Sequence, residues 1–459
     1  MNSMRRISII GTGYVGLSTA VCFASRGYDV IASTQKEENV RMINAQRAPF
    51  YEPGLEDALN YSVQSGHLRA EISRAKAVSE TDVSFITVGT PDQPDGTIDL
   101  RYVISASEDI GKALQEKDAY HLVVVKSTVT PGTTRDAVKP TLERTSHLVA
   151  GRDFGLCMNP EFLRQGSAIE DTHHPDRVVI GAYDRRSGRL LEDLLTDFHE
   201  HSVPILKMGL EAAEMVKYAS NTFLAAKISY ANEMANVCER VPGVDVTQVM
   251  KGVGLDQRIN PQFLSAGAGF GGSCLPKDAK ALLKFAEAHS YKAPMLRAVL
   301  AINDAQARRV AQLTLSALGE PKGKKVALLG LAFKPNTDDV REAPSLKIAR
   351  ALMDAGTHVS AFDPVVRQIT VPGFEALECA GSIPACLTGA HCSVVVTEWE
   401  HFKRLTPDDF TKYMAQPVVV DARRIFDPEL FSDRLTFTAV GLGEGRLSTG
   451  ARSSRSNAR

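Results

Sequence analysis

Residues 7–17 read ISIIGTGYVGL, a short apolar run followed at once by three glycines in the spacing Gly-x-Gly-x-x-Gly. A helical stretch at 17–25, a stop at Gly27 and a second apolar run at 30–33 follow, so the chain opens as a β-α-β unit. In such a unit the first glycine allows a tight turn, the second lets the backbone approach a pyrophosphate, and the third lets the helix pack closely. The stretch therefore predicts a dinucleotide site with Gly11, Gly13 and Gly16 at the cofactor.

The rest of the chain repeats this alternation twice, on either side of a helical middle. Apolar runs at 83–88, 122–125, 154–158 and 178–180 alternate with helical or loop segments, and runs at 326–329, 358–362, 393–397 and 418–420 do so again. Residues 209–241 contain no proline and almost no glycine, which predicts one long helix, with more helix at 246–251, 277–289 and 295–318. We therefore expect an α/β fold of two Rossmann-like, doubly wound parallel-sheet domains joined by a central helical domain with one long helix. The expected segments are 1–207, 208–319, 320–442 and a disordered tail, 443–459, rich in Gly, Ser and Arg.

Composition narrows the class of protein. The 459 residues carry a formal net charge of −1, which gives no reason to expect nucleic acid or an acidic membrane as partner. No apolar run approaches the roughly 20 residues of a membrane-spanning helix. The seven cysteines are scattered without a CxxC pair, which predicts free thiols in a reducing cytoplasm. No cysteine or histidine spacing suits a metal, so no metal site is expected.

The end of the second predicted strand departs from the usual dinucleotide pattern. An acidic residue that bonds the ribose hydroxyls is expected there, but residues 30–36 read VIASTQK, and Thr34 is the candidate for its place. Without a carboxylate to repel a 2′-phosphate, and with Lys36 close by, NADP could be tolerated. NAD remains the first choice.

Residues 267–278, GAGFGGSCLPKD, place a cysteine beside a predicted helix start. Pro276 and Asp278 suit the first turn of a helix, so Cys274 should lie at a helix N-terminus, where a thiol pKa is lowered. Lys277 adds positive charge, and four glycines clear side chains from the approach to the sulfur. These features predict a nucleophile, against the alternative of an inert buried cysteine. The four glycines are Gly267, Gly269, Gly271 and Gly272.

Two further candidates are more ambiguous from spacing alone. Lys217 and Asn221 are four residues apart on the long helix and share a face. This spacing favours a solvated polar face, although apolar neighbours leave room for a semi-buried pair. Glu161, in NPEFLRQG after a predicted strand end, is an acid/base candidate or, equally, an ordinary loop carboxylate.

Taken together, seven motifs resemble the UDP-glucose/GDP-mannose dehydrogenase family, over residues 5 to about 430. They are IGTGYVGL, VGTPDQPDGTIDL, VKSTVTPGTT, NPEFLRQGSAIEDTHHPDRVVIG, EMVKYASNTFLAAKIS, GFGGSCLPKD and GLAFKPNTDDVREAPSL. The resemblance implies that the C6 alcohol of a nucleotide sugar is oxidised twice, to a carboxylate, with two nicotinamide cofactors and through a thiohemiacetal and a thioester on Cys274. It implies that Lys217 stabilises the oxyanion, that Asn221 helps to bind it, and that Asp278 assists proton transfer. Glu161 and Thr128 would hold or activate water.

The resemblance also implies binding residues in each predicted domain, with the cofactor in 1–207 and the nucleotide sugar in 320–442. Besides the three glycines and Thr34, the cofactor residues would be Tyr14, Val15, Thr90, Thr128, Lys277 and Arg341. The substrate residues would be Glu161, Phe162, Leu163, Arg164, Lys217, Asn221, Phe263, Leu264, Ser265, Gly267, Gly271, Lys334 and Arg423. Arg258 matches an arginine that reaches the partner subunit's site, which implies a homodimer or higher homo-oligomer through the helical domain, 208–319.

Substrate choice within the family rests on fewer residues. RINPQFLSAGAGFGGSC, residues 258–274, is similar to the UDP-glucose branch, which makes UDP-glucuronate, and Ser273 stands where the N-acetylated sugar branch carries histidine. GDP-mannose is the near alternative. Gln165 replaces a usual glutamate, which together with Thr34 leaves a catalytically dead nucleotide-sugar or redox sensor as a different reading. A two-electron hydroxyacid dehydrogenase would need neither a nucleophilic thiol nor a second α/β domain.

Overall fold

The computed structural model describes residues 5–443, and these divide into two compact units. The first unit contains the described residues up to Thr222 together with Lys277–Ala293. The second contains Phe223–Pro276 and the described residues from Pro294 onward. All but the first residue of the predicted tail, 443–459, lies outside the described residues.

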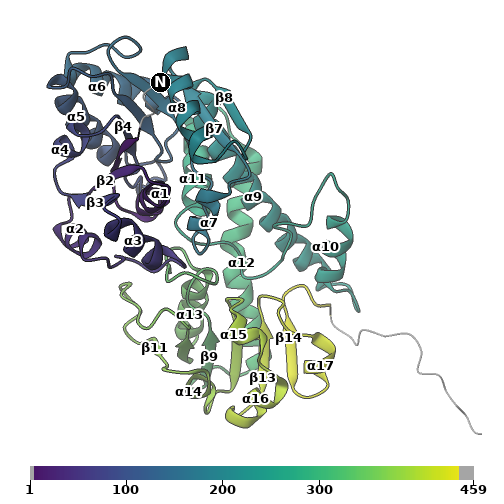
Figure 1. Ribbon diagram of the computed structural model, residues 1–459. Coiled ribbons are helices and arrows are strands. Elements are labelled where there is room, and N and C mark those ends of the chain that lie inside the picture. Colours follow the sequence, from purple (N-terminus) through teal and green to yellow (C-terminus); the bar gives the residue numbers. More distant parts are fainter. Residues whose placement is uncertain (1–4, 444–459) are drawn as a thin grey trace, which may run out of the picture. The chain divides into compact units, whose positions relative to one another are not determined.

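An eight-stranded sheet in the order β3-β2-β1-β4-β5-β6-β7-β8 forms the centre of the first unit (Figure 1). Strands β1 to β6 are mutually parallel, as predicted, whereas β7 pairs with β6 in antiparallel fashion and with β8 in parallel. The strands are β1 Arg6–Ile10, β2 Asp29–Ser33, β3 Leu68–Glu71, β4 Val83–Ile86, β5 Leu122–Val125, β6 Gly155–Met158, β7 Val178–Ala182 and β8 Ile205–Met208. The helices before β8 are α1 Tyr14–Ser25, α2 Glu37–Asn44, α3 Leu55–Gln64, α4 Arg74–Ser79, α5 Arg101–Gln115, the π-helix η1 Thr134–Val138, α6 Lys139–Ser146, α7 Ala168–His173 and α8 Arg185–Phe198.

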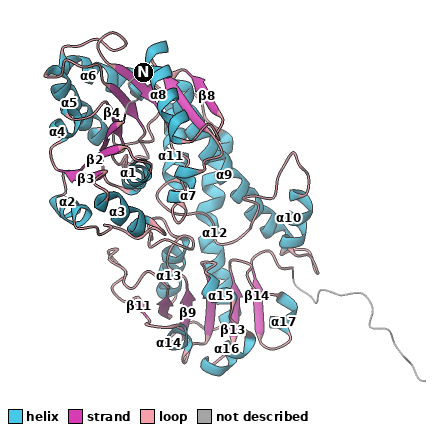
Figure 2. Cartoon of the chain, viewed as in Figure 1, coloured by secondary structure: helices cyan, strands magenta, loops and turns pink. Residues whose placement is uncertain are grey.

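The central strands bury both faces, because each alternates its side chains between two apolar clusters. Ile7 and Ile9 of β1 join a cluster with α1, α3 and α8, whereas Ile10 joins a second cluster with α4, α5 and α6. Helices therefore cover both faces of the sheet, as a doubly wound fold requires (Figure 2). This arrangement sends the loops after β1, β4 and β5 to the same edge of the sheet.

The predicted helical middle is confirmed. Helix α9 runs unbroken over Leu210–Cys238, and residues 209–324, all of them described, contain no strand. Its companions are α10 Val246–Gly254, α11 Leu275–Ala288 and α12 Pro294–Leu318. Helix α9 contributes residues to both units, and α11 belongs to the first unit from Lys277 onward.

The second unit contains a six-stranded sheet, drawn in green to yellow in Figure 1, in the order β11-β10-β9-β12-β13-β14. All of its strand pairs are parallel, so the predicted second doubly wound domain is confirmed. Its strands are β9 Lys325–Leu329, β10 His358–Phe362, β11 Glu378–Cys379, β12 Cys392–Val395, β13 Val418–Asp421 and β14 Thr436–Ala439. Its helices are α13 Pro344–Asp354, α14 Ile383–Leu387, α15 Glu400–Lys403, α16 Pro407–Tyr413 and α17 Pro428–Ser432. Among the helices that the structure describes, none combines the length and the apolar character needed to cross a membrane.

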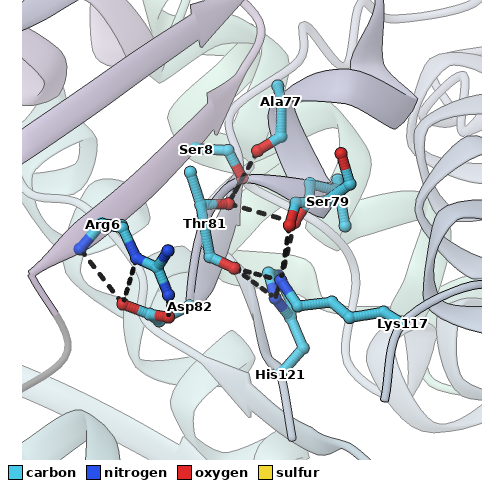
Figure 3. Close-up of polar contacts among 9 residues, drawn as sticks. Arg6, Ser8, Ala77, Ser79, Thr81, Asp82, Lys117 and His121 are labelled. Atoms are coloured by element: carbon cyan, nitrogen blue, oxygen red, sulfur yellow. Dashed lines mark hydrogen bonds and ion pairs between the residues drawn. The ribbon is translucent and has the colours of Figure 1, made fainter. Parts of the chain in front are cut away.

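A buried polar cluster joins Ser8 of β1 to Thr81, just before β4, and to His121, just before β5 (Figure 3). His121 is fully buried, with Nε2 2.8 Å from the Ser84 hydroxyl and Nδ1 3.1 Å from Lys117 Nζ. The Ser84 hydroxyl lies 2.6 Å from that of Ser8, and Lys117 also donates to the Thr81 carbonyl oxygen. Every polar side chain of this cluster thus has a partner, as buried polar groups require.

Candidate active site

The turn between β1 and α1 has the geometry of a dinucleotide cradle. Gly11 has φ +114°, and a Cβ there would lie 2.9 Å from the Thr87 carbonyl, while a Cβ on Gly16 would lie 1.8 Å from the Gly11 oxygen. A Cβ on Gly13, by contrast, would meet no protein atom within 4 Å. Helix α1 starts at Tyr14 without a side-chain cap, so its first N–H groups are available to an anion. The residues present therefore fit a pyrophosphate.

The other predicted cofactor residues of the first unit lie mostly in loops at the carboxyl ends of strands. Thr34 directly follows β2 and is buried, and Thr90, after β4, donates from its hydroxyl to the Thr128 carbonyl oxygen at 2.8 Å. Tyr14 donates to the Arg164 carbonyl oxygen at 2.7 Å, while Val15 lies half-buried in the first turn of α1. The cofactor turn and the loop that follows β6 are thus directly bonded.

Lys217 and Glu161 form a buried ion pair within the first unit. Lys217 Nζ lies 2.8 Å from Glu161 Oε1, and both side chains are less than a tenth exposed. Burial by itself would raise the pKa of Glu161, but the Lys217 charge and hydrogen bond and the Leu163 N–H hold it below its ordinary value. The solvated face that the spacing favoured for Lys217 is therefore wrong, because α9 turns this side toward the end of β6.

Asn221 and Asp278 form a second buried pair, which joins α9 to the first turn of α11. Asn221 Nδ2 donates to Asp278 Oδ2 at 2.6 Å, and Lys277 Nζ lies 2.6 Å from the other oxygen of the same carboxylate. Asp278 is only 1% exposed. Asn221, like Lys217, is buried rather than solvated, so each of the two α9 side chains has a carboxylate as its partner.

The segment after Glu161 is held by side chains of its own unit. The Phe162 ring lies under the Arg177 guanidinium, 3.9 Å from centroid to Cζ. The Arg164 N–H donates to Asp171 at 2.8 Å, and its guanidinium pairs with the same carboxylate. The Arg164 side chain is 64% exposed, so it is accessible to a ligand.

Cys274 belongs to the second unit and directly precedes α11. Of the seven cysteines, all of them within residues 5–443, Cys274 alone is exposed. Its sulfur lies 3.7 Å from the Ser273 hydroxyl. The pKa of Arg341 is raised chiefly by its hydrogen bond to Asp339, and also by the charge of a Cys274 thiolate. The guanidinium is therefore close enough to attract the sulfur. A reactive cysteine must be accessible and near a positive charge. Cys274 is exposed, and the positive charge within its reach is that of Arg341, which is itself paired with Asp339.

The structure gives a different reason for the glycines before Cys274 from the one that the sequence suggests. A Cβ would lie 2.9 Å from the Ala422 oxygen at Gly267 and 2.5 Å from the Glu342 oxygen at Gly271. Gly269 and Gly272 have positive φ and would meet Asn303 and the Phe333 ring at 2.8 Å. All four glycines are needed because other segments of the second unit pack tightly against this loop, so they are no evidence for a path to the sulfur.

The predicted substrate residues of the second unit gather at the carboxyl ends of its central strands. Arg423, after β13, lies against Gly267, donates to the Val396 carbonyl oxygen at 2.5 Å and bonds the Phe333 oxygen, next to Lys334. These loops flank the point between β9 and β12 where the strand order reverses, which is where open α/β sheets bind ligands.

The remaining predicted residues of the second unit lie on the segment that follows α10. Phe263 has a positive φ of 64° and is exposed, as is Ser265, whereas Leu264 is buried between them. Arg258 is largely exposed and pairs with Asp256 at 2.6 Å. Arg258 therefore points away from the core of its own unit.

Sequence reasoning missed two groups in the first unit. Lys126 is half-buried beside Asn159, whose Oδ1 accepts from its Nζ at 2.9 Å, and the loss of hydration lowers the pKa of Lys126 to about 8. The Glu52 carboxylate accepts from the N–H groups of Gly166 and Ala168, both at 2.8 Å. Lys126 could have been noticed as a charged residue directly after a fully apolar strand, but nothing local to Glu52 indicates its distant partners.

Comparison with known proteins covers nearly the whole chain. In the UDP-glucose/GDP-mannose dehydrogenase family, the model of the NAD binding domain matches residues 5–199, that of the central domain 211–305, and that of the UDP binding domain 327–428. The UDP-glucose 6-dehydrogenase AglM of Haloferax volcanii is 41% identical over 91% of this chain and 96% of its own. The GDP-mannose 6-dehydrogenase of Pseudomonas savastanoi pv. phaseolicola is 40% identical over 80% and 83%. The structure of a UDP-glucose dehydrogenase from Pyrobaculum islandicum, 40% identical, covers 96% of this chain and 99% of its own with a TM-score of 0.89.

The fold, the glycine turn and these matches define an NAD-dependent oxidoreductase. The chain belongs to the UDP-glucose/GDP-mannose dehydrogenase family.

Proposed function

We propose that this enzyme oxidises UDP-glucose to UDP-glucuronate in two successive steps, with Cys274 as a covalent nucleophile. The observation that carries the proposal is the exposed thiol of Cys274 directly before α11, whose first turn bears the buried Asp278. An inert cysteine would be buried, as Cys22, Cys157 and Cys386 are.

In the first oxidation the C6 hydroxyl must lose a proton while the carbon C6 loses a hydride. NAD, when bound, accepts the hydride in each of the two oxidations. We assign the proton to Asp278, directly or through a water, and the stabilisation of the oxygen to Lys217 and Asn221. An ammonium and an amide N–H₂ are the donors that a developing oxyanion needs. The product at C6 is an aldehyde.

Cys274 then keeps this reactive aldehyde on the enzyme. The thiolate forms a C–S bond with C6 while the former carbonyl oxygen takes up a proton, which gives a thiohemiacetal. Loss of the second hydride, together with the proton of that hydroxyl, leaves a thioester.

Water completes the reaction by releasing the acid. It adds to the thioester carbon, the C–S bond breaks, and the sulfur leaves as a thiolate. We assign the binding of this water to Thr128 and Glu161, because the Lys217 charge keeps Glu161 ionised and therefore able to accept the proton of the water.

For the nucleotide sugar we propose candidate residues in each unit separately. In the second unit, Gly267, Gly271, Lys334 and Arg423 lie at the strand-order switch or pack against it, the place where a nucleotide is expected. Phe263, Leu264 and Ser265 form the preceding segment, and Phe162, Leu163 and Arg164 are the contribution of the first unit. For the cofactor we propose the glycine turn with Tyr14, Val15, Thr34, Thr90 and Lys277 in the first unit. Arg341 is the candidate of the second unit.

We further propose that the enzyme is at least a homodimer. Phe223, Tyr230 and Val237 recur every seven residues along α9 and are 64%, 48% and 51% exposed. Exposed apolar side chains in one stripe of a long helix suit a second copy of the same helix. Arg258, exposed on the same unit, would then be available to the partner.

Substrate choice is tested by steady-state NADH formation with UDP-glucose, GDP-mannose and UDP-N-acetylglucosamine at equal concentrations. We expect UDP-glucose to have the highest kcat/KM and its product to gain the mass of an acid at C6. A higher kcat/KM for GDP-mannose would move the enzyme to the other branch of the family. Binding of UDP-glucose without any NADH would contradict the proposal altogether.

A further inference from the structure

We propose that Glu214 is a positioning residue of this reaction, whose carboxylate fastens the Thr128–Thr134 loop to the helix that carries Lys217 and Asn221. The inference rests on the proposed function, because Thr128 acquires its role there. All of these residues belong to the first unit.

The carboxylate of Glu214 makes one hydrogen bond with each oxygen. Oε2 accepts from the Gly132 N–H at 2.6 Å, and Oε1 accepts from the Thr134 N–H at 2.8 Å. Glu214 itself is fully buried. Backbone N–H groups that bond a buried carboxylate make strong, directional contacts, so the loop is fixed at two points, Gly132 and Thr134.

The loop is shaped to present these N–H groups. Gly132 has φ +92°, a left-handed conformation that favours glycine, and the Thr133 N–H donates to the Thr130 oxygen at 3.0 Å. At the other end of the loop, the Thr90 hydroxyl donates to the carbonyl oxygen of Thr128. Thr128 is therefore held between a contact with Thr90 and the Glu214 anchor.

Helix geometry links the Glu214 anchor to the two proposed oxyanion-binding residues. Glu214, Lys217 and Asn221 are at positions i, i+3 and i+7 of α9, so they lie on one face. A rigid helix with the loop fastened to it fixes the distance from Thr128 to both side chains. A displacement of only about 1 Å at such a site can cost a hundredfold in rate.

Burying the Glu214 carboxylate is energetically unfavourable, which argues for a specific role. Burial raises the pKa of Glu214 to about 7, against the opposing effect of the bonds from Thr134 and Gly132, and the charge of Glu211 adds to the increase. Arg135 pairs with Glu211 at 2.7 Å rather than with Glu214. A capping role alone could be served by a neutral, less costly side chain.

Four proteins test the inference: the wild type and the variants Glu214→Gln, Glu214→Asp and Glu211→Gln. Glu211→Gln is the matched control, because it removes a carboxylate one turn earlier that contacts the Arg135 side chain instead of the loop backbone. For each, kcat and KM are measured with UDP-glucose and NAD and normalised to the folded fraction. Amide hydrogen exchange of residues 128–138 is measured without ligands.

We expect Glu214→Gln to lower kcat about 10- to 100-fold while KM for UDP-glucose stays within about twofold, because substrate is held elsewhere. Exchange at 128–138 should become faster in the same variant, Glu214→Asp should recover part of both, and Glu211→Gln should match the wild type. If Glu214→Gln does not fold, Gly132→Ala tests the same contact from the loop side with the same expectation, because its Cβ would meet Asp136 at 3.0 Å.

Unchanged kcat in Glu214→Gln, or lowered kcat with unchanged exchange at 128–138, would overturn the inference. An equal loss of kcat in Glu211→Gln would do so as well. Since exchange is measured on the ligand-free protein, it tests the anchor even if UDP-glucose is not the substrate. A wild type that fails to reduce NAD with UDP-glucose would contradict the proposed function and leave the exchange result standing.

Discussion

At the scale of single residues, exposure separates one cysteine from the rest. Burial raises the pKa of Cys22, Cys157, Cys386 and Cys392, which keeps them as unreactive thiols. Cys274 is exposed and has Arg341 within electrostatic reach. An exposed sulfur near a positive charge is what the proposed covalent step requires.

Replacing that sulfur should stop the reaction before the acid is released. For Cys274→Ser we expect UDP-glucuronate production to fall at least about a thousandfold, since a serine hydroxyl is a far weaker nucleophile toward the aldehyde. Product is measured by mass spectrometry. Cys379→Ser, a partly buried cysteine far along the chain, is the control, and normal acid release by Cys274→Ser would eliminate the covalent step.

His121 gives the first unit an expected sensitivity to acid. Burial lowers the pKa of His121 to about 3, from an ordinary value near 6.5, with the Lys117 charge acting in the same direction. Between pH 3 and 6.5 the unfolded chain binds a proton at His121 that the folded chain does not bind. The free energy of unfolding must therefore fall as pH drops from about 6.5 toward 3. The slope from one such group is at most about 1.4 kcal/mol per pH unit.

His121→Gln should therefore flatten the acid limb of stability against pH, measured by urea denaturation between pH 4 and 7. The exposed residue His358 supplies the control, His358→Gln. An equally steep limb in His121→Gln would show that the buried imidazole is not a source of the acid sensitivity.

The sequence predicts individual site residues, which stay predictions, but it does not predict their surroundings. Cys274, Lys217, Asn221 and Asp278 were all named from motifs, yet spacing favoured a solvated face for Lys217 and Asn221, which are buried. Whether a helix face meets solvent depends on the end of β6 and the start of α11, which a spacing rule does not see. The ion pair with Glu161 follows from that packing alone.

At the scale of elements, buried carboxylates hold several of the loops that carry predicted site residues. Glu52 accepts from the 166–168 backbone, and Asp363 accepts from the N–H groups of Leu331 and Ala332. Asp421, at the end of β13, accepts from the Arg423 N–H at 2.9 Å. Such contacts place a loop without a further helix or strand, which is how strand ends here present binding groups.

Thr34, directly after β2, leads to a testable prediction about the choice between NAD and NADP. Thr34 stands where a carboxylate would repel the 2′-phosphate of NADP. Thr34→Asp should raise the preference for NAD over NADP, as a ratio of kcat/KM values, by about tenfold or more, since a like charge opposes the phosphate. Thr34→Val is the control for loss of the hydroxyl. No change of the ratio in Thr34→Asp would place the adenosine ribose elsewhere.

Strands with strong apolar runs were predicted and those without were not. The missed strands are β3, β8, β11 and β14, which are short and lie outside the centres of their sheets. β3 reads LRAE and β11 has two residues, so neither has a pattern that separates it from a loop. The direction of β7 and β8, antiparallel to the other strands of the sheet, could not be predicted from the sequence either. Strand direction depends on the path of the connections rather than on strand composition.

At the scale of the whole molecule, the exposed stripe on α9 predicts assembly. We expect a native mass of at least twice the chain mass of 49.8 kDa by light scattering, since the stripe should not remain in water. The double variant Phe223→Glu with Tyr230→Glu should shift the mass toward that of one chain by charging the interface. Glu233→Gln, an exposed polar position on the same helix, should not. A wild type at 49.8 kDa would contradict the proposed dimer.

The boundaries predicted at 207/208, 319/320 and 442/443 stay predictions, and they describe a different property from the two compact units. Long helices explain why: α9 contributes to both units, and most of α11 packs with the first. A division read from composition follows the kind of secondary structure, whereas compactness follows contacts between segments that are distant in sequence.

The central claim is that one enzyme performs both oxidations without releasing the aldehyde. The most direct test is the number of NADH molecules formed per UDP-glucose consumed, measured by absorbance and chromatography on the same sample. We predict two at every extent of reaction, with no free aldehyde trapped by an added hydrazine. A ratio of one, or an aldehyde that accumulates as the first product, would contradict the account.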